Sequence, residues 1–190
     1  MKKIFSLALI SMAICSFAQQ QPDKGPKRHE LKANVFNLII FKSPSFSYEY
    51  LIDRESSIGA SVLFNLAKQE EDETYFLEEP YYNEKFAFTT FYRRYFSHKY
   101  AWGFFLEAFG QYNVQRDNDE VYDHYREKYI YSDETSDNMA FGIVVGGKFV
   151  SRNGFAFEFF GGVGRNIYTS NSDIATELVP RFGVCLGYRL

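Results

Sequence analysis

Cysteine is scarce in this 190-residue chain, which contains only Cys15 and Cys185. Ile14 is bulky where a lipobox before Cys15 needs a small residue, which argues against lipidation. We expect the segment around Cys15 to be removed, so that Cys185 remains as a single thiol. One thiol forms neither an intrachain disulfide nor a metal site by itself. The sequence therefore excludes a disulfide scaffold, and we interpret Cys185 as a small packed residue.

Long apolar runs are also lacking beyond the N-terminus. Two lysines precede an apolar stretch at 4–17, and Ser16-Phe17-Ala18 has the small-x-small pattern of a cleavage site. This pattern predicts a signal peptide at 1–18, followed by a polar segment at 19–28 that we expect to be flexible. No later run approaches the ~18 consecutive apolar residues that a membrane helix needs. If the mature protein is embedded in a membrane, it must be a closed β-barrel.

Sequence motifs of common enzymes are absent as well. No GxSxG, HExxH or Walker sequence occurs, and none of His29, His98 and His124 falls mid-strand beside a serine on the same face. The net charge of -3 gives no signal for nucleic-acid binding. We therefore expect no catalytic activity, no cofactor, no metal site and no nucleic-acid partner. A lipid-modifying enzyme remains the alternative, because some outer-membrane barrels cut or transfer acyl chains.

What the chain does contain is alternation of apolar and small or polar residues. Phe155, Phe157 and Phe159 share one face of a strand, whereas Ala156 and Glu158 share the opposite face. Eight such segments are predicted as strands, at 30–41, 45–52, 57–66, 85–96, 101–113, 139–150, 154–165 and 180–190. Alternation over stretches of about ten residues is typical of transmembrane β-barrels. The sequence thus predicts an all-β fold, an eight-stranded antiparallel up-and-down transmembrane β-barrel at 29–190.

The connections between these segments differ in length. Tight turns are expected at 53–56, 97–100 and 151–153, and long polar connections are expected at 67–84, 114–138 and 166–179. Short periplasmic turns and long extracellular loops are typical of outer-membrane barrels. The first two long loops are rich in acidic residues and tyrosine. Such loops suit a basic extracellular partner or divalent cations shared with lipopolysaccharide, and a plain solvated surface is the alternative.

A secreted β-sandwich or lipocalin-like binding protein also alternates, with its apolar face turned inward. The lumen of an eight-stranded barrel is barely wide enough for its own side chains, however. The more than ~30 large apolar residues of the alternating face do not fit there, so they should point outward into lipid. Two residues break the rule: Asn37 falls on the outward face of the segment 30–41, and Arg94 falls on that of the segment 85–96, near the periplasmic end where a long cation can reach lipid headgroups.

The same parity places charged side chains on the inner face of the barrel. These residues are Glu49, Arg93, Glu107, Lys148, Glu158, Arg181 and Arg189. Unpaired charges in a narrow interior are costly, so we expect a lumen charge network in which carboxylates and cations pair. Phe91, Phe105, Phe109 and Phe160 share this face and are expected to fill the remaining space. We therefore predict that the lumen is plugged and that the protein has a structural or surface-interaction role.

Four stretches carry a resemblance to a known family. They are Ser45-Phe46-Ser47-Tyr48-Glu49-Tyr50, Phe91-Tyr92-Arg93-Arg94-Tyr95-Phe96, Phe104-Phe105-Leu106-Glu107-Ala108-Phe109-Gly110 and Arg181-Phe182-Gly183-Val184-Cys185-Leu186-Gly187-Tyr188. Over 29–190 the chain resembles small outer-membrane barrels of the OmpA/OmpX-like group, including barrels described as domains of unknown function. The resemblance implies a place in the outer membrane of a Gram-negative bacterium. It also implies contact with outer-membrane lipids, lipopolysaccharide and the barrel-assembly machinery. The chain ends on Leu190 where such barrels often carry a terminal aromatic residue.

Overall fold

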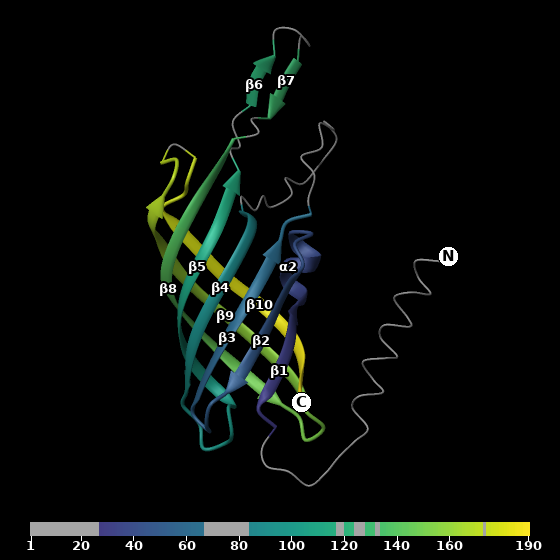
Figure 1. The fold of residues 1–190 in the computed structure, drawn as a ribbon. Coiled ribbons are helices and arrows are strands. Elements are labelled where there is room, and N and C mark those ends of the chain that lie inside the picture. Colours follow the sequence, from purple (N-terminus) through teal and green to yellow (C-terminus); the bar gives the residue numbers. More distant parts are fainter. Residues whose placement is uncertain (1–26, 67–83, 117–119, 124–127, 132–133, 173) are drawn as a thin grey trace, which may run out of the picture.

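Eight strands form a closed antiparallel barrel in the computed structural model (Figure 1). The structure describes residues 27–66, 84–116, 120–123, 128–131, 134–172 and 174–190. The barrel strands are β1 (His29–Asn34), β2 (Ser45–Leu51), β3 (Ser56–Phe64), β4 (Glu84–Tyr95), β5 (Gly103–Arg116), β8 (Thr135–Val150), β9 (Phe155–Thr169) and β10 (Leu178–Arg189). Each strand pairs with the next barrel strand along the chain, and β1 pairs with β10 to close the ring. The predicted all-β, eight-stranded, up-and-down closed barrel is confirmed.

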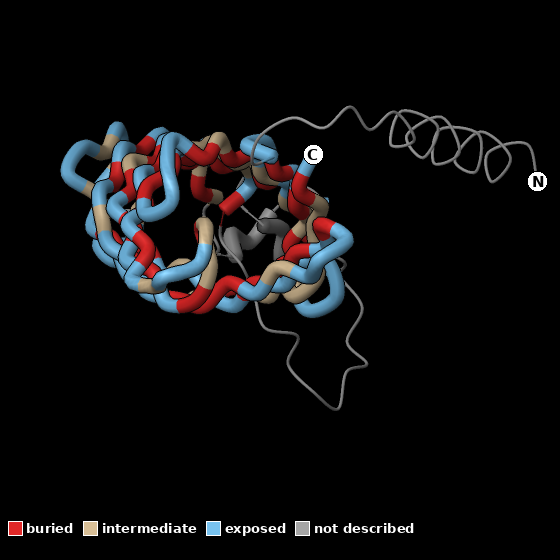
Figure 2. Tube along the Cα trace, turned by 90° about the horizontal axis from the view of Figure 1, so that it is seen from below, coloured by how far each residue is buried: buried red, intermediate tan, exposed pale blue. Residues whose placement is uncertain are grey.

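Alternation along the strands sorts the side chains into two environments. In β8, Phe141 and Ile143 are each 59% exposed, whereas Ala140 just before them and Val144 just after them are fully buried. The same switch recurs along the ring, where buried and exposed positions follow one another (Figure 2). Glu49, Glu107 and Lys148 are fully buried. The wall is therefore apolar on its outer face and charged on its inner face, the reverse of a soluble barrel with an apolar interior.

The short turns gather at the end of the barrel that carries the C-terminus (Figure 1). At the β2–β3 turn the Asp53 carboxylate accepts hydrogen bonds from the backbone N–H groups of Glu55 (2.7 Å) and Ser56 (2.8 Å). At the β8–β9 turn Gly154 has φ of 93°, a conformation that L side chains rarely adopt. These local devices fix the tight connections that the sequence predicts there.

The wall is taller than predicted on one side. β5 continues to Arg116, β8 begins at Thr135 and β9 continues to Thr169. Between β5 and β8, in a segment predicted as a loop, β6 (Glu120–Asp123) and β7 (Lys128–Tyr131) form a separate antiparallel pair. This pair projects beyond the barrel end opposite the C-terminus (Figure 1). The acidic and aromatic segment 67–83 lies outside the described residues.

The prediction of one strand over 30–41 is wrong in its second half. β1 ends at Asn34, and helix α2 (Val35–Ile40) follows. The Asn34 side chain caps this helix by accepting a hydrogen bond from the backbone N–H of Asn37 (3.2 Å), an arrangement that favours a helix start. Asn37 is 8% exposed rather than outward-facing. The helix packs on β10, with the Phe36 ring 5.6 Å from the Phe182 ring.

α2 is the only helix in the part of the chain that the structure describes, and it does not have both the length and the apolar character to cross a lipid bilayer.

Candidate functional site

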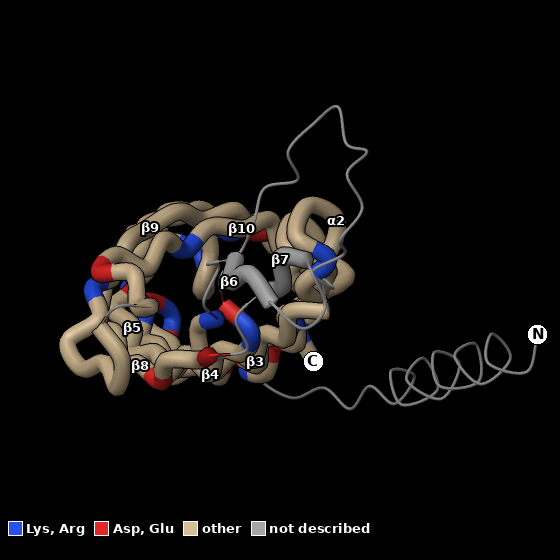
Figure 3. The backbone as a smooth tube through the Cα atoms, turned by 90° about the horizontal axis from the view of Figure 1, so that it is seen from above, with Lys and Arg blue, Asp and Glu red and all other residues tan. Residues whose placement is uncertain are grey.

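In the described chain, buried charged side chains are concentrated in the interior of the barrel. All seven charged residues predicted for the lumen point there, and two more join them, Glu30 and Lys32 of β1. We call these nine residues the interior charge network: Glu30, Lys32, Glu49, Arg93, Glu107, Lys148, Glu158, Arg181 and Arg189. Figure 3, a view of the barrel from above, shows basic and acidic residues around its wall.

Strand register brings several of these charges together. Glu30 lies opposite Arg189, Arg93 opposite Glu107, and Lys148 opposite Glu158. Directly opposed residues on one face of a sheet have adjacent side chains, so the charged groups of each of these pairs lie close together. Arg93 Nε contacts Glu107 Oε2 at 2.5 Å, and Arg189 Nε contacts Glu30 Oε1 at 2.6 Å.

Glu49 is the centre of the network. Its Oε2 atom accepts from Lys32 Nζ (2.5 Å), Lys148 Nζ (2.8 Å) and Arg93 Nη1 (3.1 Å). Its Oε1 atom accepts from the hydroxyls of Ser57 and Tyr95, both at 2.5 Å. The carboxylate is therefore held by three cations and two hydroxyl donors while fully buried. Buried charges persist only when they are paired and hydrogen-bonded in this way.

Other contacts cross the lumen rather than follow one strand pair. Glu158 of β9 accepts from Lys32 of β1 (2.7 Å) and Arg93 of β4 (2.8 Å), both through Oε2. Its second oxygen, Oε1, is buried without a hydrogen-bond partner. Arg181 Nη1 contacts Glu107 Oε1 at 2.7 Å. The network thus ties the walls of the barrel together across its interior.

Aromatic rings pack around the charges. The Arg93 guanidinium lies between Phe91 and Phe105, with its Cζ atom 4.5 and 4.4 Å from the two ring centroids. Phe109 lies 4.5 Å from the Arg181 guanidinium. A Cβ atom placed on Gly146 would stand 2.5 Å from Phe105 Cζ, so that glycine provides the space for the ring. Phe160, the fourth predicted filler, is partly buried against the same cluster.

A layer of amides lies further from the short turns. Gln111 Nε2 donates to Glu84 Oε1 (2.6 Å), and Asn138 Nδ2 donates to Asn113 Oδ1 (3.1 Å). Between this layer and Arg181 is a cavity of about 40 Å³. That is room for water but far below the roughly 300 Å³ at which small-molecule sites begin.

The arrangement is better suited to holding charge than to moving protons. Each network carboxylate already accepts from at least one cation. His29 lies outside the network, where its Nδ1 atom is 2.6 Å from the Tyr48 hydroxyl on the exposed surface. No three His, Cys, Asp or Glu residues of the described segments are grouped as metal ligands. Cys185 is buried opposite Glu158 in the β9–β10 pairing.

Sequence reasoning missed two kinds of network residue. Glu30 and Lys32 share the parity of Asn34, whereas Leu31 and Ala33 face outward, so the alternation itself could have identified them. Tyr95 and Ser57 carry no charge, and only the register of β2, β3 and β4 brings their hydroxyls to Glu49.

Comparison with known proteins gives no further assignment. No family model, no curated protein and no solved structure matches this chain.

Proposed function

We propose that this protein is an integral β-barrel of a Gram-negative outer membrane, with a plugged lumen and a structural or surface-interaction role. The observation that carries the proposal is the apolar outer wall. Phe155 is 60% exposed, Phe141 and Ile143 are 59% exposed, and Phe104 is 54% exposed. Soluble proteins rarely expose contiguous apolar patches larger than a few hundred Å². In a membrane, such a wall contacts the apolar chains of lipids instead of water.

Tyrosines on the outer wall support the same proposal. Tyr48 and Tyr92 are exposed near the strand ends that lead into the short turns, and Tyr112 and Tyr168 are exposed towards the opposite end. Between these levels β8 presents large apolar side chains outward, among them Phe141, Ile143 and Val145. Amphipathic rings at two levels flanking an apolar band match the aromatic girdles of membrane barrels.

The filled interior supports a plugged lumen. The network charges are neutralised by their neighbours, and Phe105, Tyr95 and Leu51 are almost fully buried beside them. A water-filled pore needs a continuous polar opening, which this packing opposes. The secreted binding-protein alternative needs an apolar lumen for its ligand, and the charged interior argues against it. The lipid-modifying enzyme needs an activated nucleophile with a base, and the described interior offers no histidine for that role.

Membrane fractionation and heat-dependent mobility in SDS gels test this proposal. The mature protein should stay in the membrane fraction after a carbonate wash, be extracted by detergent, and migrate differently in SDS gels before and after heating. A closed barrel has no free edge from which SDS unravels it, so heating should be needed to unfold it. Release by carbonate together with a mobility that heating does not change would overturn the proposal.

A further inference from the structure

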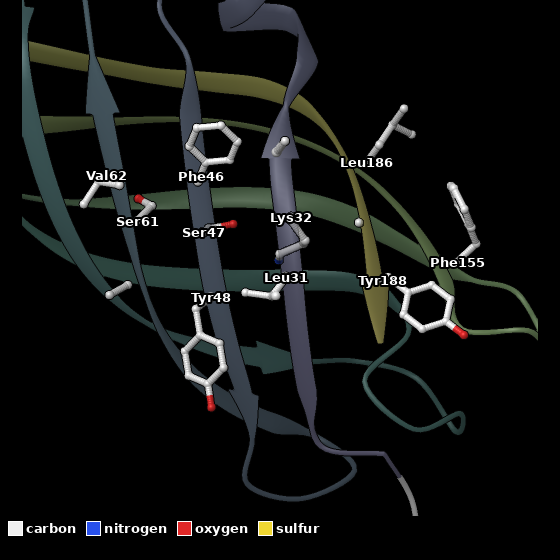
Figure 4. Close-up of a pocket in the computed structure, with 13 residues that line it drawn as sticks. Leu31, Lys32, Phe46, Ser47, Tyr48, Ser61, Val62, Phe155, Leu186 and Tyr188 are labelled. Atoms are coloured by element: carbon white, nitrogen blue, oxygen red, sulfur yellow. The ribbon is translucent and has the colours of Figure 1, made fainter. Parts of the chain in front are cut away.

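One part of the outer wall is hollowed. A groove of about 660 Å³ runs over β1 and its two neighbours β2 and β10, and it extends to β3 beyond β2 and to Phe155 of β9 beyond β10. Its sides are Phe46 and Tyr48 of β2 and Leu186 and Tyr188 of β10, which project from the wall in Figure 4. Its floor is lowest at Ala33 of β1, which pairs with both Phe46 and Leu186, whereas Leu31 of β1 stands beside it between Tyr48 and Tyr188.

The groove ends in polar and cationic groups towards the C-terminal end of the barrel. There Tyr48 contacts His29, and Lys27 Nζ lies 5.3 Å from the Tyr188 ring centroid. Arg28 is exposed next to Lys27. Glu55, an acidic group of the neighbouring β2–β3 turn, is already paired with Arg94 at 2.5 Å. An apolar channel that opens onto cationic side chains matches a molecule with a hydrocarbon chain and an anionic head.

From these features we propose that the groove is a binding site for a phospholipid with an anionic headgroup. The acyl chain lies over Ala33 between the β2 and β10 side chains, and Lys27 and Arg28 face the head. This proposal rests on the membrane location proposed above. The volume of the groove lies within the range of small-molecule sites, roughly 300–1,000 Å³.

A second copy of the chain fits the groove less well. A two-fold interface sets the same patch of both subunits against each other. Two hollows facing each other leave a void, and voids forfeit the contacts that stabilise an interface. A flexible hydrocarbon chain follows a concave floor instead.

Photolabelling in vesicles tests the site. The protein is reconstituted in phosphatidylcholine containing a small fraction of phosphatidylglycerol that carries a diazirine at its acyl end. The labelled residues are then mapped by mass spectrometry. Labelling should concentrate at Leu31, Phe46 and Leu186 over Leu106 and Ile143 of the far wall. This excess of labelling at the groove over the far wall should be smaller when the probe carries a choline headgroup.

Matched variants separate this site from ordinary contact with lipid. Ala33→Trp fills the floor and should abolish the excess at the groove, whereas Ala108→Trp, outward-facing on β5 across the ring, should leave it unchanged. Ala60→Trp, which fills the β3 side of the groove, serves as a second test if Ala33→Trp does not fold. Lys27→Gln combined with Arg28→Gln should remove the preference for phosphatidylglycerol and keep labelling by the choline probe.

The outcomes distinguish the two proposals. Equal labelling around the whole wall would overturn the lipid site and leave the membrane barrel standing. Cross-links between two copies through the groove, formed by a bifunctional reagent in the same vesicles, would do the same. An excess that survives both groove-filling substitutions would also overturn the site. No labelling anywhere on the outer wall would contradict the membrane location itself.

Discussion

Glu49→Gln is the sharpest perturbation of the interior, because it removes one charge and keeps the shape of the side chain. The Glu49 carboxylate faces Lys32, Arg93 and Lys148, all within 3.1 Å. Breaking a buried ion pair by removing one partner costs about 3–5 kcal/mol, since the other charge is left buried and unpaired. Here each cation keeps a second carboxylate, Glu158 or Glu30. We therefore expect a loss near the lower limit, about 3 kcal/mol.

Urea unfolding in vesicles measures this loss, with the fluorescence of Trp102, the only tryptophan, as the signal. The matched control is Glu55→Gln, which breaks an exposed pair with Arg94. Exposed pairs contribute about 0–1 kcal/mol, so the control should barely move the midpoint. Adding Lys32→Met to Glu49→Gln should recover part of the loss, because one uncompensated cation is removed with it. Equal midpoints for Glu49→Gln and Glu55→Gln would refute the electrostatic account of the interior.

Three further predictions concern the turns, the packing and the orientation. Hydrogen bonds from Ser56 and Glu55 lower the pKa of Asp53 below its usual value, so its carboxylate stabilises the barrel above the unfolded pKa of about 3.9. This contribution is lost as the pH falls through the lower folded pKa. Asp53→Asn should therefore lower the urea midpoint at pH 7 and have little effect at an acidic pH where Asp53 is protonated in both the folded and the unfolded protein. The same effect at both pH values would contradict this prediction. Gly146→Ala should destabilise by about 1–3 kcal/mol because its methyl group meets Phe105, whereas Gly161→Ala, with no atom within 4 Å of its added methyl, should be tolerated in the same unfolding assay. Protease added to intact cells should cut within 67–84 or 114–138 and spare 53–56 and 97–100, and cuts confined to the short turns would reverse the orientation.

Alternation was sufficient to predict the barrel and most of its interior. Because side chains repeat every two residues, Glu107 and Lys148 could be assigned to the lumen from the neighbouring outward residues alone. The partners could not be assigned in the same way. Contacts such as Lys32 with Glu158 join strands that are not neighbours, and they depend on how the strands are staggered around the ring.

The α2 region shows a second limit of sequence reasoning. Val35–Ile40 is a short apolar run, and periodicity alone does not separate a strand from a helix over so few residues. The deciding interaction is local, since the Asn34 side chain caps the helix and Asn37 becomes buried. The β6–β7 pair was missed for a similar reason, because two four-residue strands fall below the length at which alternation is convincing.

The central claim is that the outer wall faces lipid while the charges face inward. Tryptophan placed on that wall tests it most directly. In a Trp102→Phe background, Ile143→Trp reports on the middle of β8, and Arg152→Trp reports on an exposed turn. In vesicles we predict that bromine attached to lipid acyl chains quenches Ile143→Trp strongly and that aqueous iodide does not, with the opposite result for Arg152→Trp. Quenching of Ile143→Trp by iodide as strong as that of Arg152→Trp, with none from the brominated lipid, would contradict the account.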